Sequence, residues 1–216
     1  MLDFLLMNAD VVMRDLAQQH PIFHNEEDFK LKLVNLLRRS GARADPEVSL
    51  LARGSFINID VVADACEGRI ALELKYRQKP TEVIHNGETY KLKNHSALDY
   101  HRQDIWRDVE RLESVMQNPE NRVRMGFVIA LSNADGLWTV GRKLDPNDVD
   151  FRLDPGRRVD GSKTPVAMRF KPAARISEDR KHPTTIRGSY KVQWRDYSHH
   201  GFRYVVLSVG GNGLPQ

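Results

Sequence analysis

Asp60, Glu73 and Lys75 are the residues whose types and spacing best suit chemistry. Asp60 lies in one apolar run, and Glu73-Leu74-Lys75 lies in a second run that follows it directly. Side chains alternate faces along a β-strand, so Glu73 and Lys75 are expected on one face and Leu74 on the other. Two converging carboxylates suit Mg²⁺ or Mn²⁺, and a neighbouring ammonium can hold or activate a water beside a phosphate.

The competing interpretation is a Glu73–Lys75 ion pair on a half-exposed strand, since an isolated Glu-x-Lys is common by accident. Two features favour the chemical interpretation. Both runs are rich in Val, Ile and Leu, where ionisable groups are costly unless they are paired. Asp60 also lies upstream across a turn at Glu67-Gly68, which predicts consecutive strands of one hairpin.

Asp60 followed by Glu73-Leu74-Lys75 resembles the active-site signature of the PD-(D/E)xK nuclease superfamily, which has the restriction-endonuclease-like fold. The resemblance implies that Asp60 and Glu73 bind Mg²⁺, with Mn²⁺ as a substitute, and that the Leu74 carbonyl can complete the metal shell. It also implies that Lys75 orients or deprotonates the attacking water. One departure is that Ile59 precedes Asp60 where the signature has Pro.

A helix is predicted after Asn25, which can cap it, and Glu26 lies in its acidic first turn. An apolar stripe through Phe29 and Leu33 faces the core, and Glu26 projects near the edge of that stripe. Members of the superfamily often supply a further acid from this helix, so Glu26 is a candidate metal ligand. The alternative is that Glu26 only complements the helix dipole.

The order of expected elements agrees with the same fold. A short helix over 9–19 precedes the capped helix. Strands are expected over 47–52, 56–63 and 69–76, then a long amphipathic helix over 97–116, then an apolar strand over 125–132. We therefore expect an α/β protein with a restriction-endonuclease-like core over residues 25–133, in which helices flank a central mixed sheet.

Residues 80–93 are expected to form a hairpin insertion over 81–85 and 88–92, because Asn86-Gly87 is a strong two-residue turn signal. The hairpin either lies over a substrate groove, with Lys91 and Lys93 near a phosphate backbone, or extends the sheet.

The long helix offers further polar residues for the border of the site. Gln103 and Asp104 suit a satisfied polar network better than direct catalysis. Tyr100 and Arg102 are weaker candidates for phosphate contacts.

The chain is expected to be one domain, with residues 134–216 as a loop-rich, β-containing elaboration. Strands are expected there over 166–170, 190–194 and 203–209, with the last two forming a hairpin. Residues 137–216 hold 15 Lys and Arg against 8 Asp and Glu, whereas residues 1–136 hold 18 against 21. This basic excess either attracts a phosphate polymer through counterion release or is an ordinary solvated surface.

Composition and motifs exclude several classes. The single Cys66 allows no internal disulfide and is expected to be a buried or turn residue in a cytoplasmic protein. No signal peptide, membrane segment, Walker loop or dinucleotide-binding glycine pattern is visible. The histidines, including His199-His200, are expected to be surface or turn residues without partners at metal spacing.

The sequence thus predicts a Mg²⁺-dependent phosphodiesterase that hydrolyses nucleic acid, DNA more than RNA. One alternative is a catalytically inactive nuclease-fold protein that binds nucleic acid or another protein. An enzyme for a small phosphate-containing substrate is a third option. Three short strings also resemble an uncharacterised group of bacterial proteins, which implies no activity. They are Phe23-His24-x-Glu26-x-Asp28-Phe29, Leu92-Lys93-Asn94-His95 and Trp194-x-Asp196-Tyr197-Ser198. No membrane partner is expected, and an oligomer is left open.

Overall fold

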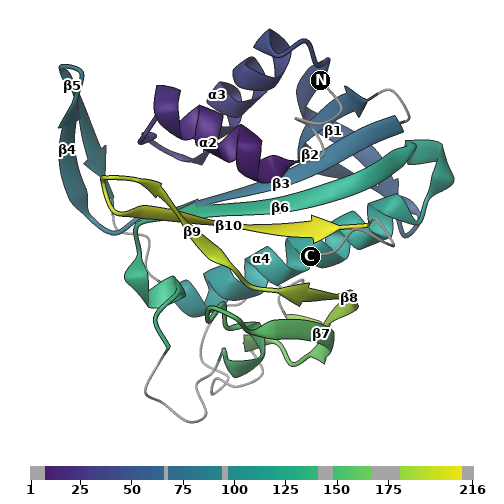
Figure 1. Ribbon diagram of the computed structural model, residues 1–216. Helices are drawn as coiled ribbons and strands as arrows, with labels where there is room; N and C mark the ends of the chain where they lie inside the picture. Colours follow the sequence, from purple (N-terminus) through teal and green to yellow (C-terminus); the bar gives the residue numbers. More distant parts are fainter. Residues whose placement is uncertain (1–7, 66–67, 94–96, 141–147, 167–180, 211–216) are drawn as a thin grey trace.

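The computed structural model describes residues 8–65, 68–93, 97–140, 148–166 and 181–210 (Figure 1). The protein is α/β, with helices on both faces of a mixed central sheet (Figure 1). Among the described residues, none of the helices combines the length and the apolar character that crossing a bilayer requires.

The central sheet has six strands in the order β1-β2-β3-β6-β10-β9. All neighbouring pairs are antiparallel except β3 and β6, which are parallel and are joined through the helix α4. The strands are β1 (Ala44–Ala52), β2 (Ser55–Ala65), β3 (Gly68–Arg77), β6 (Val123–Ser132), β9 (Trp194–Ser198) and β10 (Phe202–Val209). β3 and β6 are therefore central strands, and this explains why the sequence of β6 is almost continuously apolar, whereas β3 carries Glu73 and Lys75 on one of its faces.

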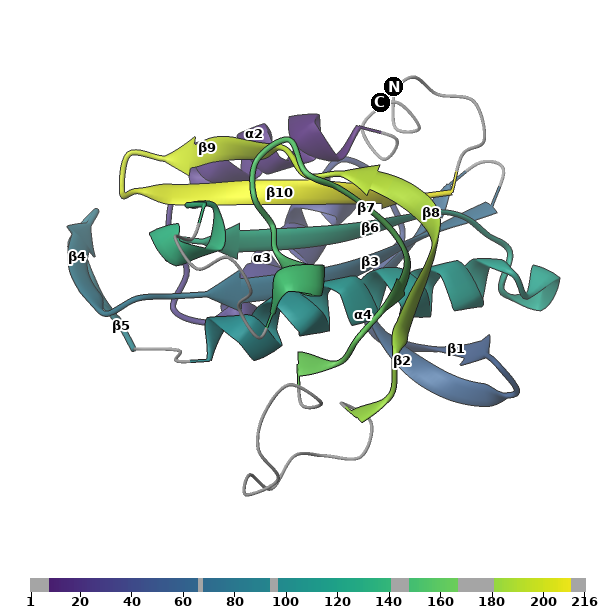
Figure 2. The same cartoon turned by 90° about the horizontal axis from the view of Figure 1, so that it is seen from below.

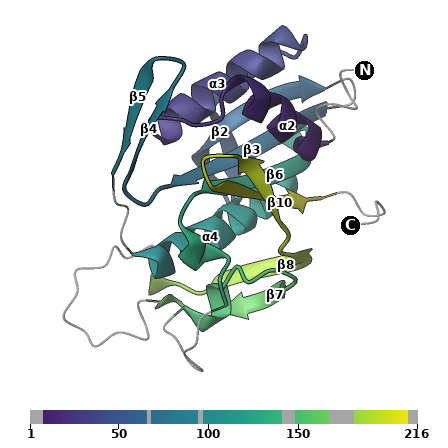
Figure 3. The same cartoon turned by 60° about the vertical axis from the view of Figure 1, so that its left-hand side comes forward.

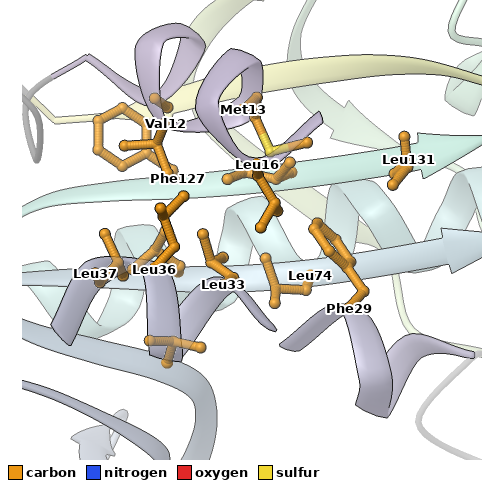
Figure 4. Packing of buried hydrophobic residues seen from close by; sticks show 14 of the residues in the cluster. Val12, Met13, Leu16, Phe29, Leu33, Leu36, Leu37, Leu74, Phe127 and Leu131 are labelled. Carbon is orange, nitrogen blue, oxygen red and sulfur yellow. The ribbon is translucent and has the colours of Figure 1, made fainter. Parts of the chain in front are cut away.

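Helices α2 (Ala9–Gln19) and α3 (Glu26–Arg39) cover one face of this sheet (Figure 1). The side chain of Asn25 caps α3 by accepting a hydrogen bond from the Asp28 N–H at 2.8 Å. Below α3 lies an apolar group that we call the α3-face cluster, and Figure 4 shows its helix side chains directed at the strands. Its members labelled there are Val12, Met13, Leu16, Phe29, Leu33, Leu36, Leu37, Leu74, Phe127 and Leu131.

Helix α4 (Leu98–Met116) covers the opposite face, and the two-stranded sheet of β7 (Arg158–Lys163) and β8 (Thr184–Lys191) packs beyond it (Figure 2). The 3₁₀ turns η1 (Pro119–Asn121), η2 (Asp135–Leu137) and η3 (Val149–Phe151) lie in the described part of this half. The apolar residues between α4 and the sheet form the α4-face cluster. They include Ala71, Ile105, Trp106, Val109, Leu112, Val128 and Phe151.

The hairpin of β4 (Thr81–His85) and β5 (Glu88–Leu92) forms its own two-stranded sheet and projects beside α3 (Figure 3). Asn86 and Gly87 both have positive φ, 49° and 80°, as the predicted two-residue turn requires. The ring of Tyr90 stacks on His24 at 4.3 Å between centroids. The hairpin therefore does not extend the central sheet, which removes one of the two alternatives.

Most expected elements of the core are confirmed, with α2, β4 and β5 matching their predicted bounds. The strand expected over 190–194 is wrong, because β8 ends at Lys191 and β9 begins at Trp194. The partner of β10 is β9. Val166 has a 3₁₀-helical conformation rather than that of a strand, while 167–170 and Cys66 lie outside the described residues.

Candidate active site

Two acids occupy the edge of β3 at the point where β2 leaves it. Pairing between β2 and β3 stops at Val61 and Leu72, although β3 continues for five more residues. Beyond that point, the N–H of Leu74 donates to Asp60 Oδ2 at 2.8 Å, and the N–H of Tyr76 donates to Glu26 Oε2 at 2.7 Å. A buried N–H must find a partner, so the two carboxylates replace the missing strand. The fold thereby fixes Asp60 and Glu26 side by side along β3.

Glu73 projects from β3 toward α4 and is only 2% exposed. Its pKa is raised well above the usual range, first by burial and then by the negative charges of Asp108 and Asp60, against a smaller lowering by Arg111. Within the described residues, no donor makes a hydrogen bond to Glu73 Oε1. The Glu73 carboxylate is therefore almost fully buried near Asp108 and Asp60, and its Oε1 accepts no hydrogen bond from the described residues.

Lys75 shares the face of Glu73, as the strand alternation predicted, and ion-pairs with Asp108 of α4 at 2.6 Å from Nζ to Oδ2. Its Nζ also donates to the Leu74 carbonyl at 3.2 Å. Burial alone would lower the pKa of Lys75, but the charges of Asp108, Glu26 and Glu73 outweigh burial and raise it above the ordinary lysine value. Lys75 is consequently an ammonium ion near neutral pH.

Arg111 of α4 closes the site on the side of β2. Its Nη2 lies 3.2 Å from Glu73 Oε1 and its Nη1 lies 3.3 Å from Asp108 Oδ1. The same guanidinium donates to the carbonyl of Asn58 in β2. The distance to Glu73 is that of an ion pair without good hydrogen-bond geometry, so Arg111 only partly neutralises that carboxylate.

A second lysine, Lys30 of α3, approaches from the other side. Its Nζ lies 3.9 Å from Asp60 Oδ1, and it also pairs with Glu27 at 2.7 Å and with Glu47. Burial raises the pKa of Glu26 above its usual range, although Lys75 and the hydrogen bond from Tyr76 oppose that rise. Lysine and arginine side chains thus neutralise only part of the negative charge of the site.

A divalent cation suits this group of residues. Asp60, Glu73 and Glu26, with the Leu74 carbonyl, offer the hard oxygen ligands that Mg²⁺ takes in proteins. Burial first, and then the negative charges of Asp108 and Asp60, raise the pKa of Glu73, so the ionised carboxylate is unfavourable in this position. A bound cation would relieve that repulsion.

The four α4 residues expected at the border of the site differ in their burial and in their contacts. Tyr100 is half-buried and packs against the α4-face cluster, and Asp104 is also half-buried in α4. Gln103 is fully buried and accepts a hydrogen bond from the Val166 N–H at 3.3 Å. Arg102 pairs with Asp148 and with the Gly136 carbonyl. Arg102 and Gln103 thus attach α4 to the segments after β6.

Lys91 and Lys93 are exposed and belong to the end of the hairpin rather than to the acid cluster. Lys91 stands opposite Glu82 in the hairpin register.

Asp108, Arg111 and Lys30 are residues of the candidate site that sequence reasoning missed. Asp104, Asp108 and Arg111 are spaced by four and three residues, so they follow one side of the helix beside the stripe of Ile105, Val109 and Leu112. This polar line next to an apolar stripe was a signal that could have placed Asp108 near the site.

Comparisons of the chain with protein-family models, with curated proteins and with solved structures found no match. The function is therefore argued from the site itself.

Proposed function

We propose that this chain is a Mg²⁺-dependent nuclease that hydrolyses phosphodiester bonds of nucleic acid, DNA in preference to RNA. The observation that carries the proposal is the buried Glu73 carboxylate, held beside Asp60 and Asp108 with Lys75 on the same strand face. Packing alone gives no reason to gather these charges, because buried acids without full partners destabilise a fold.

The order of the elements supports the same proposal. A capped helix, three antiparallel strands, a crossover helix and a parallel strand follow one another from α3 to β6. This is the order expected for a restriction-endonuclease-like core, and the candidate acids lie on α3, β2 and β3 within it.

In this proposal, Asp60, Glu73 and the Leu74 carbonyl would hold the cation, with Glu26 as a further ligand. The cation would supply Lewis acidity at the scissile phosphate and would lower the pKa of water. Glu26 and Asp60 are oriented by β3 N–H groups, so their positions are set before any ligand arrives.

Lys75 acts as a donor rather than as a base. Its pKa is raised above the ordinary lysine value, so the ammonium keeps its protons near neutral pH. Asp108 holds that ammonium from the helix side. Lys75 would then orient a water or a phosphate oxygen by hydrogen bonding, and this interaction would strengthen as negative charge develops.

Nucleic acid is favoured over a small phosphate ester by the distribution of charge. Lys91 and Lys93 are exposed on the projecting hairpin, and residues 137–216 carry a formal excess of basic residues. Such a surface attracts a polyanion with an affinity that falls as salt concentration rises.

The decisive experiment incubates the purified chain with supercoiled plasmid and with single-stranded DNA, in the presence of Mg²⁺ or Mn²⁺ and with a chelator control. Asp60→Asn and Lys75→Ala should each reduce cleavage by at least about 10²-fold. The matched control is Asp64→Asn, an exposed acid on the same strand that should leave cleavage unchanged. Cleavage by either site variant at the wild-type rate would contradict the proposal.

One observation favours the second candidate, a nucleic-acid-binding module without catalysis. Arg111 already places a positive charge 3.2 Å from Glu73 Oε1, which is the carboxylate that a cation would need. Calorimetric titration with Mn²⁺ separates the two candidates. Heat of binding that disappears in Asp60→Asn supports the nuclease, whereas DNA binding without any Mn²⁺ binding supports the module.

A further inference from the structure

Three histidines from two separate hairpins meet at one end of the molecule. His85 is the last residue of β4, and His199 and His200 form the turn between β9 and β10. One ligand nitrogen from each residue can be chosen so that all three lie within 4.8 Å of one another. Figures 1 and 2 both show the two hairpins at the same end of the central sheet. His199 and His200 are turn residues, as expected, but they do not lack a further imidazole nearby, because His85 supplies one from 114 residues away in the sequence.

The rings form one group rather than a chance pair. The centroid of His200 lies 3.9 Å from that of His199 and 5.6 Å from that of His85. His200 Nε2 is buried, and within the described residues it has no hydrogen-bond partner. A buried ring nitrogen without a partner is unusual in a folded protein, and a bound ligand is one explanation of it.

The chemistry of the group suits a metal ion. Imidazole nitrogens bind a metal through their lone pairs, and each of the three rings can place one nitrogen in the group.

Imidazole nitrogen is a ligand for Zn²⁺ rather than for Mg²⁺, which takes oxygen. A tetrahedral zinc site with Zn–N distances of about 2.0–2.1 Å places its nitrogens roughly 3.3 Å apart. The three nitrogens must therefore move closer by about 1.5 Å at most. His199 is exposed, and His85 and His200 are half-buried, so rotation of the rings can supply this movement.

We propose that His85, His199 and His200 bind one Zn²⁺ ion, which fastens the β4–β5 hairpin to the β9–β10 turn. The other strand of the hairpin is already attached to the loop before α3, where His24 stacks on Tyr90 and pairs with Glu88 at 2.8 Å. Zinc would attach β4, the strand that does not contact His24, to the β9–β10 turn. The hairpin would then be held on both sides, and the exposed Lys91 and Lys93 would have a fixed position. This proposal does not depend on the proposed nuclease activity.

The first test measures zinc binding by untagged, metal-stripped protein, with calorimetry for affinity and elemental analysis for stoichiometry. We expect one Zn²⁺ per chain. His85→Ala and His200→Ala should each weaken binding by more than about 100-fold, since loss of an outer-shell partner alone can cost 10–100-fold. His182→Ala is the matched control, because His182 is exposed and outside the group. Asp60→Asn should bind zinc normally, which separates this site from the carboxylate site.

The second test asks whether zinc fastens the hairpin. Zinc should raise the melting temperature of the wild type and slow amide hydrogen exchange over residues 81–92, and neither change should occur in His85→Ala. Circular dichroism of the metal-free variants verifies that they fold. Absence of zinc binding by the wild type, or wild-type affinity in both histidine variants, would overturn the proposal. Binding without slower exchange in the hairpin would overturn its fastening role.

Discussion

The two faces of β3 differ sharply although they belong to one strand. Toward α3, the strand presents Leu72, Leu74 and Tyr76, which join the α3-face cluster. Toward α4, it presents Glu73 and Lys75, which meet Asp108 and Arg111. The first face buries apolar area and needs no exact partner. The second face holds charges that are stable only in one arrangement of neighbours.

The apolar face of β3 thus contributes to folding, whereas the charged face contributes the groups for the proposed chemistry. Burial of a large apolar side chain contributes about 1.5–3 kcal/mol to stability. Burial on the α3 face can therefore offset the free-energy cost of placing charged groups on the other face. Proteins often carry such locally unfavourable groups at functional sites. Substitutions on the two faces should therefore act on different properties.

Leu33→Ala should give the largest loss of stability and should leave the site chemistry intact. Leu33 is fully buried in the α3-face cluster (Figure 4), and truncation of a buried Leu costs about 2–5 kcal/mol. Urea denaturation measures the loss. Leu31→Ala is the matched control, since Leu31 on the same helix is 45% exposed and should change stability little. Equal losses in both variants would mean that the α3 face is not the main source of stability.

Asp108→Asn should act on chemistry more than on folding. Without the Asp108 charge, the Lys75 ammonium loses its anchor, and we expect cleavage of plasmid DNA to fall by about 10–100-fold, as for loss of a positioning partner. Asp108→Glu should recover part of that activity. Glu110→Gln on the same helix is the control, because Glu110 pairs instead with Arg53 at 2.7 Å. Unchanged cleavage by Asp108→Asn would show that Asp108 does not position Lys75.

Asn25→Ala lies between the two extremes, because it alters the helix that carries Glu26. Loss of the cap should destabilise the protein by about 1 kcal/mol, measurable as a lower urea midpoint. Asn25→Ser should restore most of the stability, since serine also caps helices. If the serine variant is as unstable as the alanine variant, the cap is not the cause.

Glu73→Gln should give the smallest change in stability, and this change should be an increase. The folded-state pKa of Glu73 is raised above the usual 4.5 by burial and by Asp108. The stability linked to the protonated form is present below about pH 4.5 and is lost as pH rises through the folded-state pKa. Glutamine mimics the protonated form. The metal-free variant should therefore melt slightly above the wild type at pH 7 and show no such gain at pH 4. A lower melting temperature at pH 7 would mean that the Arg111 pair outweighs the repulsion.

The sequence could predict most helices and strands of the core because their signals are local. The cap at Asn25, the Asn86-Gly87 turn and the apolar alternation around Glu73 each act over a few residues. The strand boundary near Lys191 was missed because β8 and β9 belong to different sheets, and this change of partner leaves no local pattern.

Sequence reasoning found the side chains of the site that lie on β3, but not those that reach it from α4. Glu73 and Lys75 could be placed on one face from alternation alone. Whether Asp108 and Arg111 reach the site depends on the rotation of α4 about its axis against the sheet, and tertiary packing determines that rotation. The Leu74 N–H donates to Asp60 and the Tyr76 N–H donates to Glu26 because the pairing of β2 with β3 ends before these residues. No local sequence pattern predicted where that pairing ends.

The position of β10 between β6 and β9 has a consequence for synthesis of the protein. β6 is complete at Ser132, but the strand that pairs with its free side is not made until Val209. During translation, a long apolar strand therefore presents an unpaired edge, and such edges template aggregation. We expect ribosome-bound chains that stop before β10 to be chaperone clients, and chains released there to aggregate.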